Sequence, residues 1–134
     1  MGASVQMLDK FVHCGAICAQ EGSFVEKLEA VLPKGCAVDA FLQFDEWLYL
    51  GSAASGARSR LSDYLRRQRQ RSGKLKHAEL RKCLEAGLVE FWVLPIEPRV
   101  RQIDGYPVDW LLGVEHGLIK TLHPRINARE RVHD

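Results

Sequence analysis

Two apolar, aromatic-rich segments stand next to each other in the middle of the chain and restrict what it can fold into. They are AVDAFLQF over residues 37–44 and WLYLGSA over residues 47–53, and Asp45 and Glu46 separate them. Two short apolar runs joined by a polar turn predict a β-hairpin. A third run of this kind, LVEFWVL over residues 88–94, predicts a third strand.

The segments around these strands have the apolar spacing of helices. Their order predicts an α/β domain, in which a small, mostly antiparallel three-stranded sheet is flanked by helices. We expect residues 1–35 to form an N-terminal helical extension and residues 36–134 to form the domain itself. Between the last strand and the last helix we expect a loop, and after Pro124 a polar tail. The predicted helices cover residues 4–12, 22–32, 56–70, 77–85 and 108–122.

The composition excludes several classes of protein. A chain of 134 residues that is 46% hydrophobic, with a net charge of +2, suits one folded domain and does not suit a disordered chain. No apolar run approaches the roughly 20 residues that a bilayer requires, and the first residues lack the pattern of a signal peptide. We therefore expect a soluble cytoplasmic protein without membrane contact. The four cysteines are expected to be reduced packing residues.

The charge is concentrated in one segment. Residues 58–82 contain ten basic and two acidic residues, a net charge of +8, whereas the other 109 residues have a net charge of −6. A positive segment in an otherwise acidic chain is typical of proteins that bind a polyanion. Arginine predominates in it, and the arginine fork matches phosphate oxygens. Because the segment lacks an apolar face with Trp or Phe, nucleic acid is a better candidate than a membrane surface.

Four local features could carry chemistry, although each also has an ordinary structural explanation. Tyr49 stands near the end of the second hairpin strand. Arg60 and Tyr64 are four residues apart and therefore share a helical face. Glu115 lies close to the apolar face of the last helix, where a carboxylate is costly unless it is paired or holds a metal. Asn127 follows that helix and could orient Glu115 or form a turn.

The order of these features resembles the GIY-YIG endonuclease family, as a small single-domain member. The resemblance covers residues 37–127 and depends on four motifs: YLG at residues 49–51, RLSDY at 60–64, the glutamate of the last helix, and PRIN at 124–127. The sequence departs from the family at the first motif. Strand pairing would place the family's first tyrosine near Asp39 or Phe41, where this chain has no tyrosine.

The resemblance implies a metal-dependent endonuclease that hydrolyses phosphodiester bonds in DNA. One Mg²⁺ (or Mn²⁺) would be held by Glu115, Tyr49 would act as general base or align the water, and Arg60 would stabilise the charge on the phosphate. Tyr64 would hydrogen-bond within the same site, and Asn127 would orient the glutamate helix. For Tyr49 to act as a base, nearby positive charge would have to lower its pKa.

The DNA substrate could be branched or a specific duplex, and the protein could be a monomer or a homodimer. The alternative is a nucleic-acid-binding module that keeps the fold but does not cut, and the absent first tyrosine supports it. The residues expected to bind nucleic acid are Arg58, Arg66, Arg67, Arg69, Arg71, Lys74, Lys76 and His77.

Overall fold

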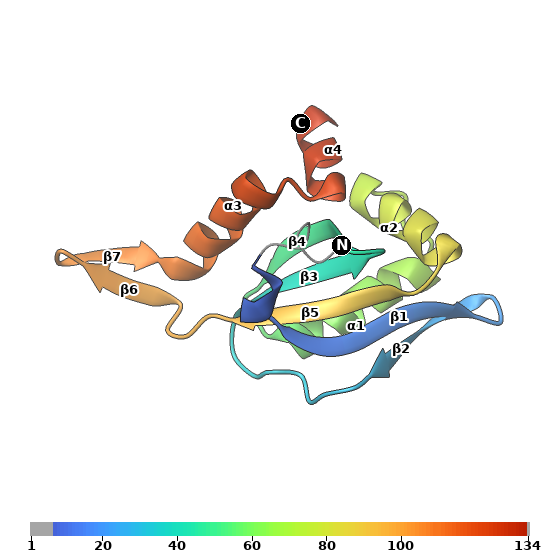
Figure 1. The fold of residues 1–134 in the computed structure, drawn as a ribbon, viewed down its shortest axis with the longest axis horizontal. Helices are drawn as coiled ribbons and strands as arrows, with labels where there is room; N and C mark the ends of the chain where they lie inside the picture. The colour runs from blue at the N-terminus through green and yellow to red at the C-terminus, as the bar shows by residue number, and fades with distance from the viewer. Residues whose placement is uncertain (1–6, 134) are drawn as a thin grey trace.

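The computed structural model describes residues 7–133 and shows a five-stranded antiparallel sheet (Figure 1). The strand order is β2-β1-β5-β3-β4, so that β2 and β4 are the two edge strands. A single turn of 3₁₀ helix, Leu8–Lys10, precedes the first strand. The strands are β1 Val12–Gln20, β2 Ser23–Leu28, β3 Ala37–Gln43, β4 Glu46–Ala53 and β5 Val89–Pro95.

The predicted hairpin, third strand and three of the predicted helices are confirmed. The hairpin of β3 and β4 pairs Phe41 with Tyr49 and Asp39 with Gly51. On its other side β3 pairs with β5, so the three predicted strands form one end of the sheet. The confirmed helices are α1 Ala57–Arg69, α2 Leu75–Ala86 and α3 Trp110–Leu122.

The prediction of helices in the first 35 residues was wrong, and residues 4–6 of the first predicted helix lie outside the described residues. β1 and β2 form a second hairpin, whose turn residues Glu21 and Gly22 both have positive φ angles of 52° and 78°. Two such residues make the type of tight turn that joins antiparallel strands. Val31, assigned to the apolar face of the second predicted helix, is 88% exposed. β1 pairs with β5 and enlarges the sheet from three strands to five.

The predicted loop after β5 and the predicted polar tail also have regular structure. β6 (Val100–Ile103) and β7 (Tyr106–Asp109) form a two-stranded hairpin, which extends away from the five-stranded sheet (Figure 1). Asp104 and Gly105 form its turn, again with positive φ angles. The tail forms helix α4, Arg125–His133. The Asp-Gly pair is a strong signal for a hairpin that the sequence analysis did not use.

The two faces of the sheet bury separate apolar clusters. Leu61 and Leu65 of α1 and Leu80 and Leu84 of α2 pack on one face, together with Phe41 and Phe91 of the sheet. Leu111 and Leu118 of α3 pack on the other face, against Val38, Ala40 and Leu50. Helices on opposite faces therefore meet the same edge strand, β4. Within residues 7–133 no helix combines the length and apolar character needed to cross a membrane.

Candidate functional site

The functional residues expected from the sequence meet at the end of edge strand β4. Tyr49 lies on β4, and Arg60 and Tyr64 lie on α1, which follows that strand. A guanidinium N–H of Arg60 donates a hydrogen bond to the hydroxyl of Tyr64. The Arg60 guanidinium carbon is also 4.8 Å from the centre of the Tyr64 ring, and the rings of Tyr49 and Tyr64 are 6.4 Å apart. The three side chains thus form one contiguous group.

Gly51 provides the space in which Arg60 lies. A Cβ atom at this position would stand 2.8 Å from a terminal nitrogen of Arg60, 3.2 Å from the Tyr49 ring and 3.3 Å from an oxygen of Asp39. Non-bonded carbon atoms normally approach to about 3.5–4 Å. The glycine of the YLG motif is therefore required by close packing of the guanidinium against β4.

Asp39 is a residue of this site to which the sequence analysis gave no role. It lies on β3 opposite Gly51, and its exposed fraction is 0%. Its Oδ1 is 3.6 Å from Nε of Arg60. Burial raises the pKa of this carboxyl, while Arg60 opposes the rise. Strand pairing located the position, but no sequence pattern shows that an aspartate there is completely buried beside an arginine.

The hydroxyl of Tyr49 remains protonated in this environment. Burial is the largest cause that raises its pKa above the ordinary value, and the carboxylates of Glu130, Asp39 and Glu115 add to it. Arg60 acts in the opposite direction but does not outweigh them. Arg60 alone therefore does not give Tyr49 the lowered pKa that a general base would need. Aligning a water through a neutral hydroxyl is compatible with this geometry.

Glu115 approaches the same place from α3, on the other face of the sheet. Its side chain is 14% exposed, and burial raises its pKa, whereas His116, Arg60 and a hydrogen bond from Ser52 oppose the rise. The ion pair with His116 is long, at 3.9 Å. A partly buried carboxylate with a raised pKa is one that a cation would stabilise in its charged form. Arg60, Ser52 and Glu115 thus connect the two faces around the end of β4.

The donors at this place fit one hydrated Mg²⁺ or Mn²⁺ and do not form a complete metal cage. Among residues 7–133 no group of three or more His, Cys, Asp or Glu side chains could hold a metal ion. Magnesium keeps several waters and is commonly bound by one or two carboxylates together with phosphate oxygens of the substrate. Glu115 supplies such a carboxylate, while Asp39, although buried, is close enough to raise its pKa.

Asn127 joins α4 to the edge strand. Its side-chain oxygen accepts a hydrogen bond of 2.8 Å from the backbone N–H of Leu50, and its amide nitrogen donates one of 3.0 Å to the Leu50 carbonyl. An edge strand leaves half of its backbone groups without a partner strand. Asn127 therefore takes the place of a neighbouring strand at Leu50, between Tyr49 and Gly51. Its contacts are with the strand that carries the site.

We expect Asn127→Ala to destabilise the protein by about 2–4 kcal/mol, because it leaves two buried backbone groups unpaired at roughly 1–3 kcal/mol each. Urea unfolding followed by circular dichroism measures the loss. Gln102→Ala is the matched control, since it removes an exposed amide from β6. Equal unfolding free energies for the two variants would contradict this account of Asn127.

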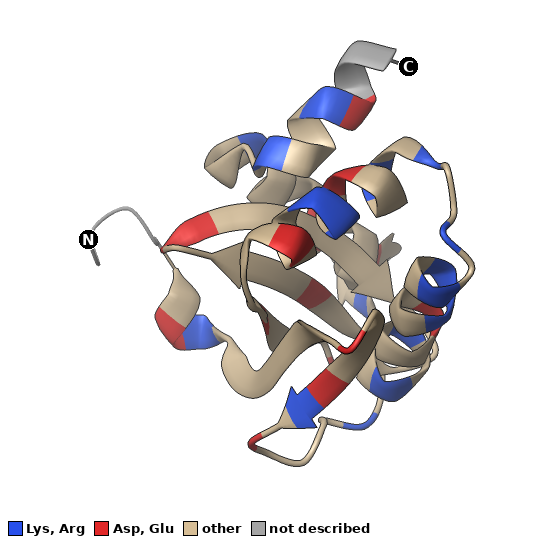
Figure 2. Ribbon diagram, turned by 90° about the vertical axis from the view of Figure 1, so that its right-hand side faces the viewer, with Lys and Arg blue, Asp and Glu red and all other residues tan. Residues whose placement is uncertain are grey.

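The basic residues of segment 58–82 differ in their surroundings. Figure 2 shows Lys and Arg concentrated along α1 and the connection from α1 to α2. Arg58 forms a two-pronged ion pair with Glu26 of β2, and Arg66 and Arg67 pair with Asp63. Within the described part of the chain no salt bridge engages the remaining basic residues of the expected interface, which are Arg69, Arg71, Lys74 and Lys76.

Lys76 and its neighbour His77 differ in burial and in charge. The Lys76 amine lies 5.7 Å from the centre of the Tyr49 ring, and burial and Arg60 lower its pKa. His77 is 3% exposed, and its Nδ1 is 2.7 Å from the Ser72 hydroxyl. Burial is the main cause that lowers the pKa of His77 to about 4, so the ring is neutral at pH 7. Lys76 thus lies beside Tyr49, whereas the neutral His77 ring is buried with its centre 6.5 Å from that of the Tyr64 ring.

The buried His77 should make the protein sensitive to acid. Its pKa in the folded state, about 4, is below its ordinary value of 6.5. The unfolded chain therefore binds the proton more readily, and the free energy of unfolding falls as the pH drops from 6.5 towards 4. We expect His77 to account for about 2–3 kcal/mol of this fall. Urea unfolding at pH 7 and pH 4.5 measures it.

Between pH 7 and pH 4.5 the free energy of unfolding should fall less in His77→Gln than in the native protein. The difference between the two falls should be most of the contribution expected from His77. His123→Asn, which replaces an exposed histidine at the C-terminal end of α3, is the control and should keep the native pH dependence. A His77→Gln protein that loses as much stability at pH 4.5 as the native protein would show that another group is responsible.

The fold has counterparts among solved structures. No protein-family model and no curated protein matches the chain. A mutant of EndoII from bacteriophage T4 superposes with a TM-score of 0.65 and 19% identity, over 85% of this chain and 89% of that one. Restriction endonuclease HPY188I, in complex with product DNA, gives a TM-score of 0.51 and 11% identity, over 84% and 76%. The chain thus has a fold that is found in a DNA endonuclease.

Proposed function

We propose that this protein is a metal-dependent DNA endonuclease of the GIY-YIG type, with its reaction centre at the end of β4. The observation that carries the proposal is the meeting of Tyr49, Arg60 and Glu115 around Gly51 and Ser52. They come from three elements on two faces of the sheet. An arginine can stabilise the charge on a phosphoryl group, a neutral phenol can align a water, and a single carboxylate can hold one metal ion for hydrolysis of a phosphodiester. The shared fold with HPY188I supports this assignment.

Arg60 is assigned to the phosphate that is cut. Its guanidinium is half-buried, and its ordinary charge is maintained because Tyr64, Asp39 and Tyr49 raise its pKa against the effect of burial. A fixed positive charge in a place partly shielded from water stabilises the negative charge that develops on the phosphoryl oxygens. Asp39 and Tyr64 hold the guanidinium in position. Arg60 therefore enters the reaction without having to reorganise.

Glu115 is assigned to the metal ion. Bound to Glu115 and to phosphate oxygens, Mg²⁺ would supply Lewis-acid stabilisation of the phosphoryl group and of the leaving 3′ oxygen. Ser52 lies close enough to the Glu115 carboxyl to favour its charged form. Asn127 fixes the β4 backbone two residues before Ser52.

Tyr49 is assigned to aligning the attacking water. Because its pKa is raised, its hydroxyl remains neutral and can donate or accept a hydrogen bond. Lys76, above the ring of Tyr49, adds positive charge beside the water and the phosphate. The remaining basic residues of the expected interface, apart from the buried His77, are assigned to phosphates away from the cut, where they give affinity without sequence information.

The alternative is a module of the same fold that binds DNA without cutting it. One observation favours it: a buried aspartate and a buried phenylalanine, Asp39 and Phe41, occupy the two positions near which the resemblance implies a tyrosine. In that case Arg60 would bind phosphate, and Glu115 would be a structural carboxylate. The two candidate functions differ in their need for a divalent metal.

Incubation of 5′-labelled linear and branched duplexes with the native protein tests the choice between them. We expect shorter labelled products with Mg²⁺ or Mn²⁺ and intact DNA with EDTA. Binding of the same duplexes, measured by fluorescence anisotropy in EDTA, shows that the protein sample is able to bind DNA. A folded protein that binds every duplex and cuts none of them with either metal would overturn the nuclease and leave the binding module.

A further inference from the structure

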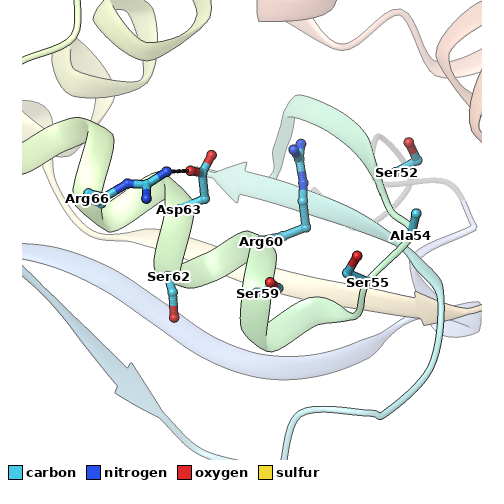
Figure 3. A pocket seen from close by; sticks show the side chains of 8 residues that line it. All are labelled: Ser52, Ala54, Ser55, Ser59, Arg60, Ser62, Asp63 and Arg66. Atoms are coloured by element: carbon cyan, nitrogen blue, oxygen red, sulfur yellow. Dashed lines mark hydrogen bonds and ion pairs between the residues drawn. The ribbon is translucent and has the colours of Figure 1, made fainter.

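A cavity of about 570 Å³ adjoins the group of site residues, and half of the residues that line it are serines (Figure 3). Four serines line it: Ser52 at the end of β4, Ser55 in the connection to α1, and Ser59 and Ser62 on α1. Arg60 also lines it and belongs at the same time to the candidate reaction centre. The cavity therefore begins at the reaction centre and continues along α1. We call it the serine trough.

The spacing of the serines explains the shape of the trough. Residues 59, 62 and 66 follow the spacing i, i+3 and i+7, which places them along one side of α1, and Ser55 lies in the connection just before the helix. Serine is small, so this side is hollow, and Arg66 closes its far end. The opposite side of α1 is apolar and packs on the sheet through Leu61 and Leu65.

The chemistry of the lining indicates what the trough binds. Serine hydroxyls donate hydrogen bonds, and the guanidinium groups of Arg60 and Arg66 carry positive charge. Asp63 is the acidic residue of the lining, and Arg66 and Arg67 pair with it. These donors suit the oxygens of a phosphate backbone.

The lining also indicates what the trough does not bind. No aromatic side chain is among the residues that line it. Proteins that hold unpaired bases do so mainly by stacking them on aromatic rings, each stack contributing roughly 1–3 kcal/mol. A trough of hydroxyl and guanidinium groups can hold sugar and phosphate but offers a base no surface to stack on. Recognition in the trough is therefore independent of sequence.

Resting on the proposed function, we infer that the serine trough binds the sugar–phosphate backbone of one DNA strand next to the scissile phosphate. From Ser59 to Arg66 the helix rises by roughly 10 Å, at 1.5 Å per residue. A strand of B-form DNA rises by about 3.4 Å per nucleotide. The trough thus accommodates about three nucleotides, on one side of the cut. It orients the strand so that the phosphate to be cut reaches Arg60.

A short oligonucleotide without bases tests the inference. The probes are a thymidine trinucleotide, an abasic trimer with the same sugar–phosphate backbone, and the abasic trimer with neutral methylphosphonate links. Binding is followed by nuclear magnetic resonance titration at low salt with EDTA. We expect the two charged trimers to bind with dissociation constants within about twofold of each other. The neutral trimer should bind at least about fivefold more weakly.

Substitution locates the binding. Ser62→Asp, which puts a negative charge in the trough at an exposed position, should weaken binding of the abasic trimer at least about fivefold. Ser23→Asp on β2, at the opposite edge of the sheet, is the matched control and should bind as the native protein does. Thermal unfolding of both variants verifies that they fold.

Either of two results would overturn the inference: loss of binding when the bases are removed, or equal binding by Ser62→Asp and Ser23→Asp. Both leave the nuclease proposal intact if the protein cuts labelled duplex with Mg²⁺. Conversely, trimer binding in the trough by a protein that never cuts DNA would keep the backbone site and overturn the nuclease. The two failures are therefore distinguishable.

Discussion

Glu115→Gln should abolish cleavage and leave DNA binding almost unchanged. Glutamine keeps the shape of the side chain and the hydrogen bond from Ser52, but it removes the negative charge assigned to the metal ion. Lewis-acid stabilisation by a metal contributes several kcal/mol, and each 1.36 kcal/mol corresponds to a factor of ten in rate. We therefore expect the single-turnover rate to fall at least about 10³-fold. Affinity, which depends on the basic segment, should change by less than about threefold.

The rate is measured under single-turnover conditions with a labelled duplex and Mg²⁺, and the affinity is measured by anisotropy in EDTA. Glu85→Gln on α2 is the matched control, because it removes an exposed carboxylate outside the site. That variant should cut at the native rate. A Glu115→Gln protein that cuts within tenfold of the native rate, or loses affinity and rate in equal measure, would refute the metal role of Glu115.

Gly51→Ala should reduce cleavage by about two orders of magnitude. The added methyl group would lie 2.8 Å from a terminal nitrogen of Arg60 and 3.3 Å from an oxygen of Asp39. Because Asp39 is completely buried, the side chain that can move is Arg60. Displacing a catalytic group by about 1 Å can cost on the order of 10²-fold in rate. The loss should appear in the rate of the bound complex, since the basic residues of segment 58–82 other than Arg60 are unaffected.

Gly113→Ala is the control for this substitution. Gly113 lies inside α3, and an added Cβ there would meet no atom within 4 Å. Alanine in a helix interior is more favourable than glycine by roughly 0.5–1 kcal/mol, so this variant should be slightly more stable and fully active. Single-turnover cleavage rates of Gly51→Ala, Gly113→Ala and the native protein test this prediction. Native activity in Gly51→Ala would show that the close packing of Arg60 against β4 does not matter for cleavage.

The central elements could be predicted because each has an unambiguous pattern. The hairpin of β3 and β4 has two apolar runs around a polar turn, and α1 and α3 keep helical spacing for more than ten residues. The N-terminal hairpin was predicted as helices because Phe24, Val25 and Leu28 also fit a helical stripe. In the structure both residues lie on the edge strand β2, where the side chain of Phe24 is buried and that of Leu28 is 40% exposed. Short edge strands bury few side chains and therefore give a weak pattern.

The site could be predicted in part. Tyr49, Arg60, Tyr64 and Glu115 were selected from their order in the chain, and the structure places them around the end of β4. The burial of Asp39 beside Arg60 depends on pairing between strands and on a helix that crosses above them. Both are properties of the tertiary structure. The helical spacing of Ser59, Ser62 and Arg66 can be read from the sequence. The cavity itself depends on the tertiary structure, because α1 and the end of β4 line it together.

Nicking of supercoiled plasmid by the native protein tests the central claim most directly, because one cut in either strand relaxes the whole molecule. The account predicts conversion to the open circular form with Mg²⁺ or Mn²⁺, none with EDTA, and none above background with Glu115→Gln. Plasmid that stays supercoiled with both metals, in the presence of folded protein bound to it, would contradict the account. Equal nicking by the native protein and Glu115→Gln would contradict it as well.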